Sequence, residues 1–160
     1  MRDMYNIILI IIKSLSLNLL ELQCYDIYNN DIFELIISLL NTINLDNSNI
    51  DNLKNEIYNA CKTDVNLMKL IRKTQENRYG IQIEKEVSFS TIPNKAVLVV
   101  GSNIKELETI LEALKNEDID IYTHDEMMLA YTFPKFSEYS RLKGQFGVGL
   151  ENCLLDFATF

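Results

Sequence analysis

Apolar residues recur at intervals of three and four through the first half of the chain, which is the spacing of one face of a helix. Two clear series are Ile32, Leu35, Ile36, Leu39 and Leu40, and Leu53, Ile57, Tyr58, Cys61 and Val65. Neither glycine nor proline occurs between residues 4 and 78. We predict three or four helices, at about residues 4–28, 31–43, 50–61 and 63–76. Their short connections, such as the polar stretch 44–52, favour an antiparallel bundle.

The aliphatic run Ile7–Ile12 near the N-terminus raises the question of a membrane segment. A membrane span needs about 20 apolar residues, and Lys13 would lie near its middle. Asp3 is unlike the positively charged start of a signal peptide. We therefore expect a buried core helix in a cytoplasmic protein that does not enter a membrane.

The pattern changes at Gly80, the first glycine of the chain and a residue typical of helix C-termini. Residues 81–89 alternate loosely, as a short strand or an extended connector would, and Pro93-Asn94 predicts a turn. We expect a helical bundle over residues 1–80, an extended connector over 81–94 and a second domain over 95–160.

The second domain begins with Ala96–Val100, a continuous apolar run rich in β-branched residues. Such a run is typical of a strand that is buried on both faces. A helical stripe follows over 104–114, and residues 119–122 predict another strand. Strand, helix and strand in this order predict a parallel pair with a right-handed crossover. The predicted fold class is α+β followed by α/β: a helical bundle and then the start of a Rossmann-like domain.

Charge and cysteine content narrow the possible functions. With 15 Lys and Arg against 23 Asp and Glu, the formal net charge is -8, and no basic cluster offers the phosphate contacts on which nucleic-acid binding depends. Cys24, Cys61 and Cys153 are widely separated and form no C-x2-C pair. We expect three reduced, mostly buried thiols, as is usual in cytosolic proteins.

Candidate chemistry lies beyond the carboxyl ends of the two predicted strands, where open α/β sheets bind ligands. Two segments qualify: Gly101–Asn103 after the first strand and Thr123–Glu126 after the second. Adjacent strands about 4.8 Å apart would make these segments neighbours. His124 is the only histidine of the chain, and Asp125 and Glu126 offer carboxylates for metal binding or acid–base chemistry.

Each of these residues also has a structural interpretation. Gly101 suits a tight strand-to-helix turn, and Ser102 or Asn103 suits a helix N-cap. His124 beside a strand end can be a hydrogen-bonding structural residue. No G-x-G-x-x-G motif follows the first strand. The glycines Gly144, Gly147 and Gly149 follow no segment of strand character, and the aromatic stretch 131–139 is expected to pack a loop.

Order, spacing and residue type over residues 97–149 resemble the hybrid-cluster protein family of hydroxylamine reductases. That family shows a strand, then Gly-His-Asp-Leu, a helix, a Val-Tyr-Thr-His-Gly-Glu-Met segment, a Tyr-Pro stretch and a Gly-Asn-Tyr-Gly turn. The corresponding segments here are Gly101–Ile104, Tyr122–Met127, Phe133–Phe136 and Gly144–Gly147. The stretch 61–80 is similar to the family's helical part, so the resemblance covers residues 5–160.

The resemblance implies an iron–sulfur oxidoreductase that reduces hydroxylamine to ammonia, with nitric oxide reduction also attributed to the family. It implies a cubane cluster near the N-terminus and a hybrid iron–sulfur–oxygen cluster where the helical and Rossmann-like domains meet. One His, two Glu and several Cys hold the hybrid cluster in the family.

Carried over residue by residue, the resemblance places the first Glu ligand at Glu126 and the His ligand at Ser102. A hydroxyl is a much weaker iron ligand than an imidazole. His124 matches no ligand position, and we expect it to orient Glu126 or its loop. The three cysteines match no family ligand position that can be identified, and the N-terminal four-cysteine motif has no counterpart.

These departures predict a chain that is truncated at both ends relative to the family and that alone binds no cluster and is inactive. Under a first hypothesis, a second polypeptide carries the missing Cys-containing domains and the pair reduces hydroxylamine. Under a second, which we favour for the isolated chain, it is a non-catalytic remnant or a structural subunit of a split protein. A third, less favoured, is an unrelated α/β domain that binds a small ligand.

Overall fold

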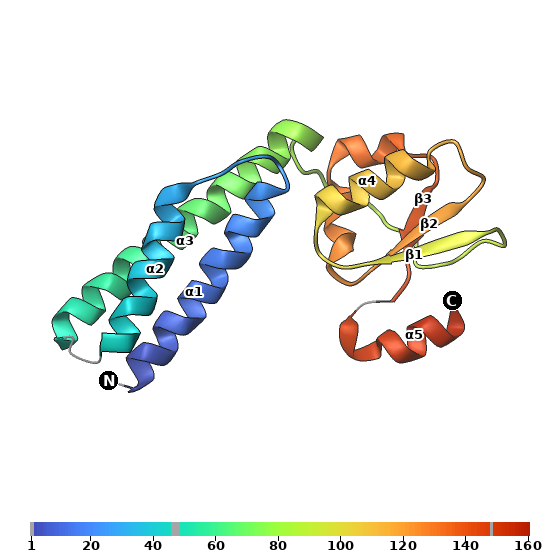
Figure 1. The fold of residues 1–160 in the computed structure, drawn as a ribbon. Coiled ribbons are helices and arrows are strands. Elements are labelled where there is room, and N and C mark those ends of the chain that lie inside the picture. Colours follow the sequence, from blue (N-terminus) through green and yellow to red (C-terminus); the bar gives the residue numbers. More distant parts are fainter. Residues whose placement is uncertain (1, 46–48, 148) are drawn as a thin grey trace. The chain divides into compact units, whose positions relative to one another are not determined.

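The computed structural model describes residues 2–45, 49–147 and 149–160 (Figure 1). The chain divides into two compact units, the first ending at Thr74 and the second formed by Gln75–Phe160. The first unit is helical, and the second contains a three-stranded parallel sheet with helices. The predicted fold class is therefore confirmed.

The first unit consists of α1 (Arg2–Gln23), α2 (Asn30–Leu45) and the greater part of α3 (Ile50–Tyr79). Residues 46–48 of the predicted connection lie outside the described residues. α1 ends earlier than predicted because the chain turns at Asp26, which has a φ of +59°. The core of this unit is aliphatic and draws on all three helices: Ile8, Ile11, Leu15, Leu19, Leu22, Ile32, Leu39, Leu53, Ala60, Leu67 and Ile71.

The alternative of a fourth helix, with a break near residue 62, is wrong because α3 runs unbroken through this region. This part of α3 carries a polar contact with α1. Asp64 accepts hydrogen bonds from Ser14 Oγ at 2.7 Å and from Asn18 Nδ2 at 2.8 Å, both on α1. A polar position within a helical repeat can thus mark a contact with a neighbouring helix.

α1 is long and apolar enough to cross a membrane by length and composition alone, and it is the one such helix among the described residues. Five of its aliphatic residues are nevertheless buried in the core of the first unit. A core helix of a bundle passes the same test, and this burial agrees with the predicted core helix. Ile10 and Leu17 remain exposed on another side of α1.

The second unit is built on three parallel strands, β1 (Ala96–Val100), β2 (Asp120–His124) and β3 (Leu142–Gln145), paired in the order β1-β2-β3. β1 matches the prediction, but β2 is longer than predicted and includes Thr123 and His124, which were expected to follow it. β3 was missed because it has little apolar character; Gly144, taken for part of a loop, lies within it.

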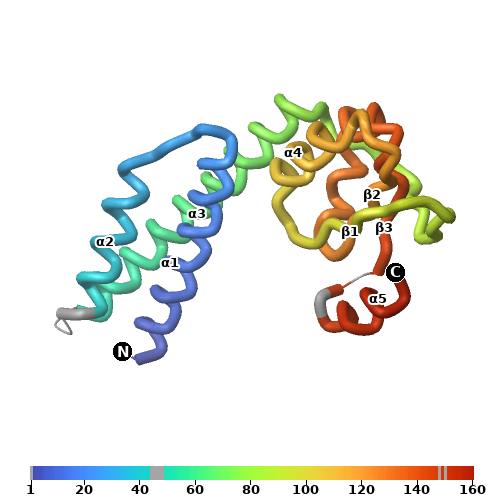
Figure 2. The backbone as a smooth tube through the Cα atoms, turned by 45° about the vertical axis from the view of Figure 1, so that its right-hand side comes forward, coloured from blue at the N-terminus to red at the C-terminus, as the bar shows by residue number. Residues whose placement is uncertain are grey.

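Helical segments cover both faces of this sheet. α4 (Ile104–Leu114) connects β1 to β2 as predicted, and two 3-10 helices, η1 (Asp125–Thr132) and η2 (Pro134–Glu138), connect β2 to β3. A short η3 (Leu150–Asn152) precedes α5 (Cys153–Thr159). Figures 1 and 2 show α4 and α5 on opposite sides of the sheet. The aromatic stretch 131–139 packs this loop region, as expected, since Tyr131, Phe133 and Phe136 are buried.

β1 does not have the position that its composition suggested. The apolar run predicted a strand buried on both faces, yet β1 lies at the edge of the described sheet, and Val97 and Val100 are 37% and 38% exposed. The strand that is buried at every residue is β2. The prediction of burial for β1 is therefore wrong for this chain taken alone.

The segment between α3 and β1 is an extended connector and not a strand. Gly80 ends α3 as predicted: its φ is +93°, and its N–H donates to Glu76 O at 2.9 Å. Ile83 N then donates to Thr132 O, and Ser88 O accepts from Gln145 N at the edge of β3. The connector therefore lies against η1 and against the edge of β3.

Glu108 joins three elements of the second unit. Its side chain is only 5% exposed and forms ion pairs with Arg78 Nε at 2.9 Å, Lys105 Nζ at 2.8 Å and Lys135 Nζ at 2.6 Å. Tyr79 OH donates to the same carboxylate. Burial raises the pKa of Glu108, but the hydrogen bonds from the three cations outweigh burial and lower the pKa to about 2. Glu108 thus ties the end of α3 and η2 to α4.

The unbroken course of α3 can be tested with proline at Lys62, an exposed position. Lys62→Pro should destabilise the first unit by about 3 kcal/mol or more, because proline within a helix removes a hydrogen bond and clashes with the preceding turn. Lys62→Ala should change stability little. Urea unfolding followed by far-UV circular dichroism measures both, and a proline variant as stable as the alanine variant would contradict a continuous helix.

Glu108 also predicts how stability depends on pH. Because the pKa of Glu108 is lowered from 4.5 to about 2 by folding, its contribution is complete above pH 4.5 and disappears as the pH falls toward 2. Glu108→Gln should destabilise the second unit at pH 7 by about 2 kcal/mol, since it leaves three partly exposed cations without their partner. The difference between the two proteins should shrink below pH 4.5; a difference independent of pH would contradict this account.

Candidate site at the carboxyl ends of the first two strands

The carboxyl ends of β1 and β2 lie side by side. In the parallel register Val100 is opposite His124, so the segments that follow, Gly101–Asn103 and Asp125–Glu126, leave the sheet next to each other. The expectation that these two segments are neighbours is thereby confirmed. Met127 is also placed here: its Cε lies 3.4 Å from the position that a Cβ on Gly101 would take.

Asn103, and not Ser102, is the residue that caps α4. Asn103 Oδ1 accepts hydrogen bonds from Lys105 N at 2.9 Å and Glu106 N at 3.2 Å, which satisfies two of the free N–H groups at the helix start. Ser102 is exposed. Of the two residues that the sequence allowed for this cap, the structure selects one, and Ser102 stands beside the site without this structural role.

Asp125 makes the sharp turn from β2 into η1, with a φ of +59°. Few residues other than glycine adopt this left-handed conformation, although aspartate tolerates it better than most. Asp125 occupies the place of the glycine in the Thr-His-Gly-Glu-Met segment with which this stretch was compared. The turn brings Glu126 into the first turn of η1, where its side chain is exposed.

Gln145 fixes the backbone of this turn from the neighbouring strand. It is buried at the end of β3, and its Nε2 donates to Asp125 O at 3.0 Å and to Gly147 O at 3.2 Å. Its Oε1 accepts a hydrogen bond from Thr123 Oγ1. The sequence alone gave no role to Gln145, because a single amide in an unrecognised strand carries no signal of its partners.

His124 lies at the end of β2 and is fully buried. Its Nε2 is 2.9 Å from Asp156 Oδ2 on α5, and its ring meets Phe157 edge-on with centroids 5.5 Å apart. Gly147, with a φ of +81°, permits this contact, because a Cβ there would overlap both the His124 ring and the Asp156 carboxylate. His124 Nδ1 is buried without a hydrogen-bond partner in the part of the chain that is described. These contacts join His124 to α5. The role predicted for His124, which is to orient Glu126 or its loop, stays a prediction.

Glu126 borders an open, mainly apolar hollow between the connector and η1. The other lining residues are Lys85, Val87, Phe89, Asp125, Met128, Leu129 and Thr132. Phe89, Met128 and Leu129 are each about half exposed. Besides Glu126, the charged residues that line this hollow are Asp125 and Lys85.

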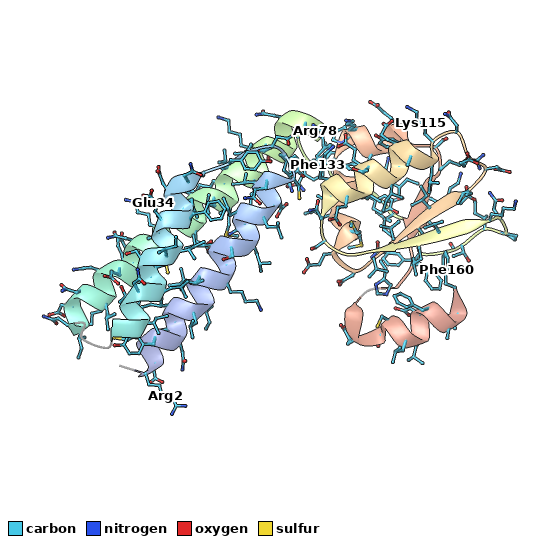
Figure 3. The ribbon with its side chains drawn as sticks, viewed as in Figure 1. Arg2, Glu34, Arg78, Lys115, Phe133 and Phe160 are labelled. Carbon is cyan, nitrogen blue, oxygen red and sulfur yellow. The ribbon has the colours of Figure 1, made fainter. Side chains whose placement is uncertain are left out.

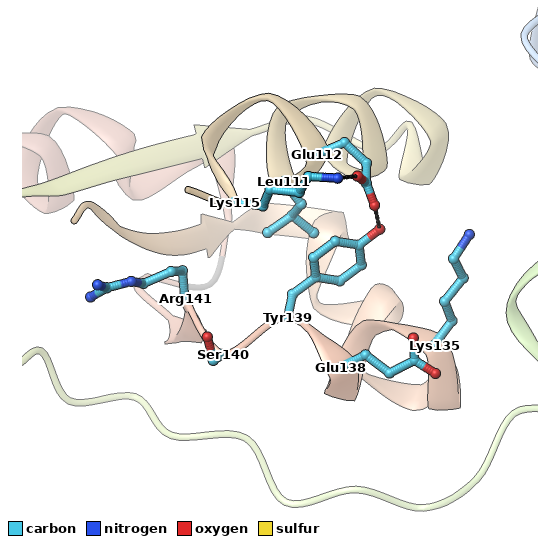
Figure 4. A pocket seen from close by; sticks show the side chains of 8 residues that line it. All are labelled: Leu111, Glu112, Lys115, Lys135, Glu138, Tyr139, Ser140 and Arg141. Atoms are coloured by element: carbon cyan, nitrogen blue, oxygen red, sulfur yellow. Dashed lines mark hydrogen bonds and ion pairs between the residues drawn. The ribbon is translucent and has the colours of Figure 1, made fainter. Parts of the chain in front are cut away.

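A second hollow lies at the other end of α4 and contains none of the predicted site residues (Figure 4). Several of its charges are paired: Glu112 Oε1 accepts from Tyr139 OH at 2.7 Å, and Glu112 Oε2 pairs with Lys115 Nζ at 2.9 Å. Arg141 pairs with Asp118 and Asp120. This hollow does not adjoin the carboxyl ends of β1 and β2, so it is separate from the candidate site.

The described residues do not form a complete metal site. They contain no group of three or more His, Cys, Asp or Glu side chains that could hold an ion. The expectation of mostly buried thiols is wrong, because Cys61 is exposed and Cys24 and Cys153 are only partly buried; none of the three forms a disulfide. Cys24 follows the end of α1, Cys61 occupies an exposed position of α3, and Cys153 begins α5, which has no buried residue. The side chains of the described residues by themselves therefore do not fit an iron–sulfur cluster.

The turn at Asp125 gives a direct test of the local geometry. Asp125→Val should lower stability by about 1–2 kcal/mol relative to Asp125→Gly, because a β-branched residue is strained at positive φ and glycine is not. Thermal unfolding of the two variants and the parent chain measures this. Equal stability of the valine and glycine variants would show that the turn does not have the left-handed conformation.

Comparison with known proteins connects this geometry to a family. The profile of the Prismane/CO dehydrogenase family matches residues 25–160. Proteins named hydroxylamine reductase are similar over shorter stretches: 32% identity over 111 residues in Yersinia pseudotuberculosis, 33% over 99 residues in Acidiphilium cryptum and 26% over 135 residues in Actinobacillus succinogenes.

These matches cover 62–84% of this chain but only 18–24% of the relatives. The chain thus spans about one fifth of the length of the curated relatives that it matches. The family match includes both strand ends, the turn at Asp125 and Glu126. The chain belongs to the Prismane/CO dehydrogenase family.

Proposed function

We propose that this chain supplies the Glu126 side of an iron–sulfur cluster site in a hydroxylamine reductase made of two polypeptides, and that it is inactive alone. The observation that carries the proposal is the position of Glu126: it is exposed, it lies two residues after the buried strand β2, and the loop that follows β1 is next to it. The name of the similar proteins supports the reaction, hydroxylamine reduction.

The chain's own residues would hold Glu126 in place and bind no complete cluster. Asp125 turns the backbone, and Gln145 anchors its carbonyl to β3. A carboxylate is a suitable iron ligand, whereas the hydroxyl of Ser102 is a poor one. The thiolates that an iron–sulfur cluster requires would come from the second polypeptide.

A second candidate is a non-catalytic remnant or structural subunit of a split protein. Ser102 favours it, because this exposed residue does not cap α4 and offers only a weak ligand where the resemblance implies an imidazole. The two candidates differ in one measurable respect, which is whether Glu126 affects bound iron once a cysteine-containing partner is present.

The test is anaerobic co-expression with the part of the Yersinia pseudotuberculosis hydroxylamine reductase that follows the matched stretch. The purified complex should contain iron and sulfide. Glu126→Gln should weaken iron retention on the order of tenfold or more against a chelator, since even residues behind the ligands of metal sites have effects of that size. Ser102→His should strengthen it.

The matched control is Glu117→Gln, which changes an exposed carboxylate in the turn between α4 and β2, at the amino ends of the strands. This variant should retain iron like the parent complex. If Glu126→Gln and Glu117→Gln behave alike, or if the complex holds no iron, Glu126 is not a ligand and the non-catalytic candidate is correct.

A further inference from the structure

The side-chain amide of Gln145 bonds to two turns that follow neighbouring strands, one after β2 and one after β3. We propose that Gln145 is a positioning residue that couples the turn carrying Glu126 to the packing of α5, so that a displacement of α5 also displaces Glu126. The proposal rests on the proposed function for the role of Glu126 as a ligand. The coupling itself is a property of the chain and does not require iron.

The backbone of Gln145 provides a fixed base for its side chain. Gln145 N donates to Ser88 O of the connector at 2.9 Å, and the next residue, Phe146, donates from its N–H to Thr123 O of β2 at 2.7 Å. Gln145 is only 1% exposed. A buried side chain on a strand that is bonded on both sides keeps its direction better than a side chain on a loop.

The partners of the amide fix its orientation. Nε2 donates to Asp125 O at 3.0 Å and to Gly147 O at 3.2 Å, while Oε1 accepts from Thr123 Oγ1. A flipped amide would bring Oε1 against two carbonyl oxygens, which only accept hydrogen bonds. The two carbonyl groups therefore share one donor group, and displacing either turn alone breaks one of its hydrogen bonds.

The first of these hydrogen bonds acts directly on the backbone of Glu126. Asp125 O belongs to the peptide group that joins Asp125 to Glu126, so a displacement of this carbonyl moves the Glu126 backbone as well. Asp125 has a φ of +59°, a conformation that is unfavourable for residues with a Cβ. The turn therefore depends on outside support, and the Nε2 group of Gln145 supplies it.

The second hydrogen bond reaches the part of the chain that packs against α5. A Cβ on Gly147 would overlap both the His124 ring and the Asp156 carboxylate, so these two side chains lie directly against the backbone of Gly147. They contact each other with Nε2 and Oδ2 2.9 Å apart. If Asp156 moves away with α5, the Gly147 backbone loses its packing, and Gly147 O is the second acceptor of the Gln145 amide.

α5 is attached to the sheet by a small number of side chains. No residue of this helix is buried. Besides the contact of Asp156 with His124, Phe157 meets the His124 ring and Phe160 meets Phe146 edge-on at 5.1 Å (Figure 3). Elements with few buried contacts open locally at a lower free energy than the whole domain. Loosening of α5 would therefore regulate the ligand position without unfolding the second unit.

Amide hydrogen exchange of the full chain, measured by mass spectrometry in the absence of iron, tests the coupling. Gln145→Met keeps the length of the side chain but removes its two donors and its acceptor. This variant should speed exchange in residues 124–129 on the order of tenfold, the effect of losing about one hydrogen bond. Exchange in α4 should stay at the parent rate.

The matched control is Gln82→Met, because Gln82 Nε2 donates to Thr132 Oγ1 at 3.0 Å, at the far end of η1. This variant removes an amide from the same unit without touching the turn at Glu126, and exchange in residues 124–129 should not change. A general loss of stability would speed exchange in α4 as well, so the pattern distinguishes positioning from a merely structural role.

Asp156→Ala tests the other half of the coupling, because it removes the carboxylate that contacts His124. It should speed exchange in residues 124–129 in the parent chain and have a much smaller effect in the Gln145→Met background, since the effects of coupled residues are not additive. Leu155→Ala, at an exposed position of the same helix, should have no effect on these residues.

Circular dichroism verifies that each variant folds. If Gln145→Met does not fold, Thr123→Val replaces it. This variant removes the partner of Gln145 Oε1, which orients the amide, and leaves both carbonyl acceptors in place. It should speed exchange in residues 124–129, and parent-like exchange would overturn the inference.

The outcomes separate this inference from the proposed function. Equal exchange in Gln145→Met and Gln82→Met, or additive effects of Asp156→Ala and Gln145→Met, would overturn the inference. In the two-polypeptide complex, Gln145→Met should weaken iron retention in the parent but not in the Glu126→Gln background. A complex without iron, together with the predicted exchange pattern, would support the coupling and refute the proposed function. Iron that depends on Glu126 but not on Gln145 would do the reverse.

Discussion

The second unit depends on the burial of β2 between β1 and β3. Every residue of β2 is buried, and its ends are tied by different means. Asp120, at the amino end, is surrounded by Asn94, Arg141 and Lys143; burial alone would raise the pKa of Asp120, but these neighbours lower it. At the carboxyl end, His124 contacts Asp156. The central strand therefore has a fixed register, and this register brings Glu126 next to the loop after β1.

A consequence of this arrangement is that hydrogen bonds hold the backbone beneath the candidate site, while the described residues form no group of three or more potential metal ligands. Gln145 and Tyr131 hold this backbone: Tyr131 OH donates to Gly144 O, and burial raises the pKa of Tyr131 to about 12, so the hydroxyl stays neutral and keeps donating. Glu126 lies beside these residues and borders the mainly apolar hollow. Positioning is thus a property of this chain, while chemistry requires groups that its described residues do not bring together.

Periodicity predicted the elements with a strong apolar signal, including β1 and α4 with their observed bounds, and Gly80 as the end of α3. Periodicity was less successful for segments in which polar residues make the structural contacts. Periodicity left open a break near residue 62, whereas α3 is continuous there and Asp64 bonds to α1. β3 has too little apolar character to be recognised. The strand-end rule located Glu126 and His124, but Gln145 and Asp156 come from segments remote in sequence. Only the folded chain brings them together.

The proposed function makes Glu126 one ligand of a cluster whose thiolates come from a second polypeptide. Anaerobic reconstitution of the isolated full chain with iron and sulfide, followed by gel filtration and iron analysis, tests this most directly. The account predicts that no iron elutes with the chain, because the described residues offer no group of three ligands and a stable cluster needs several thiolates. A stoichiometric amount of iron, lost in Glu126→Gln, would contradict it.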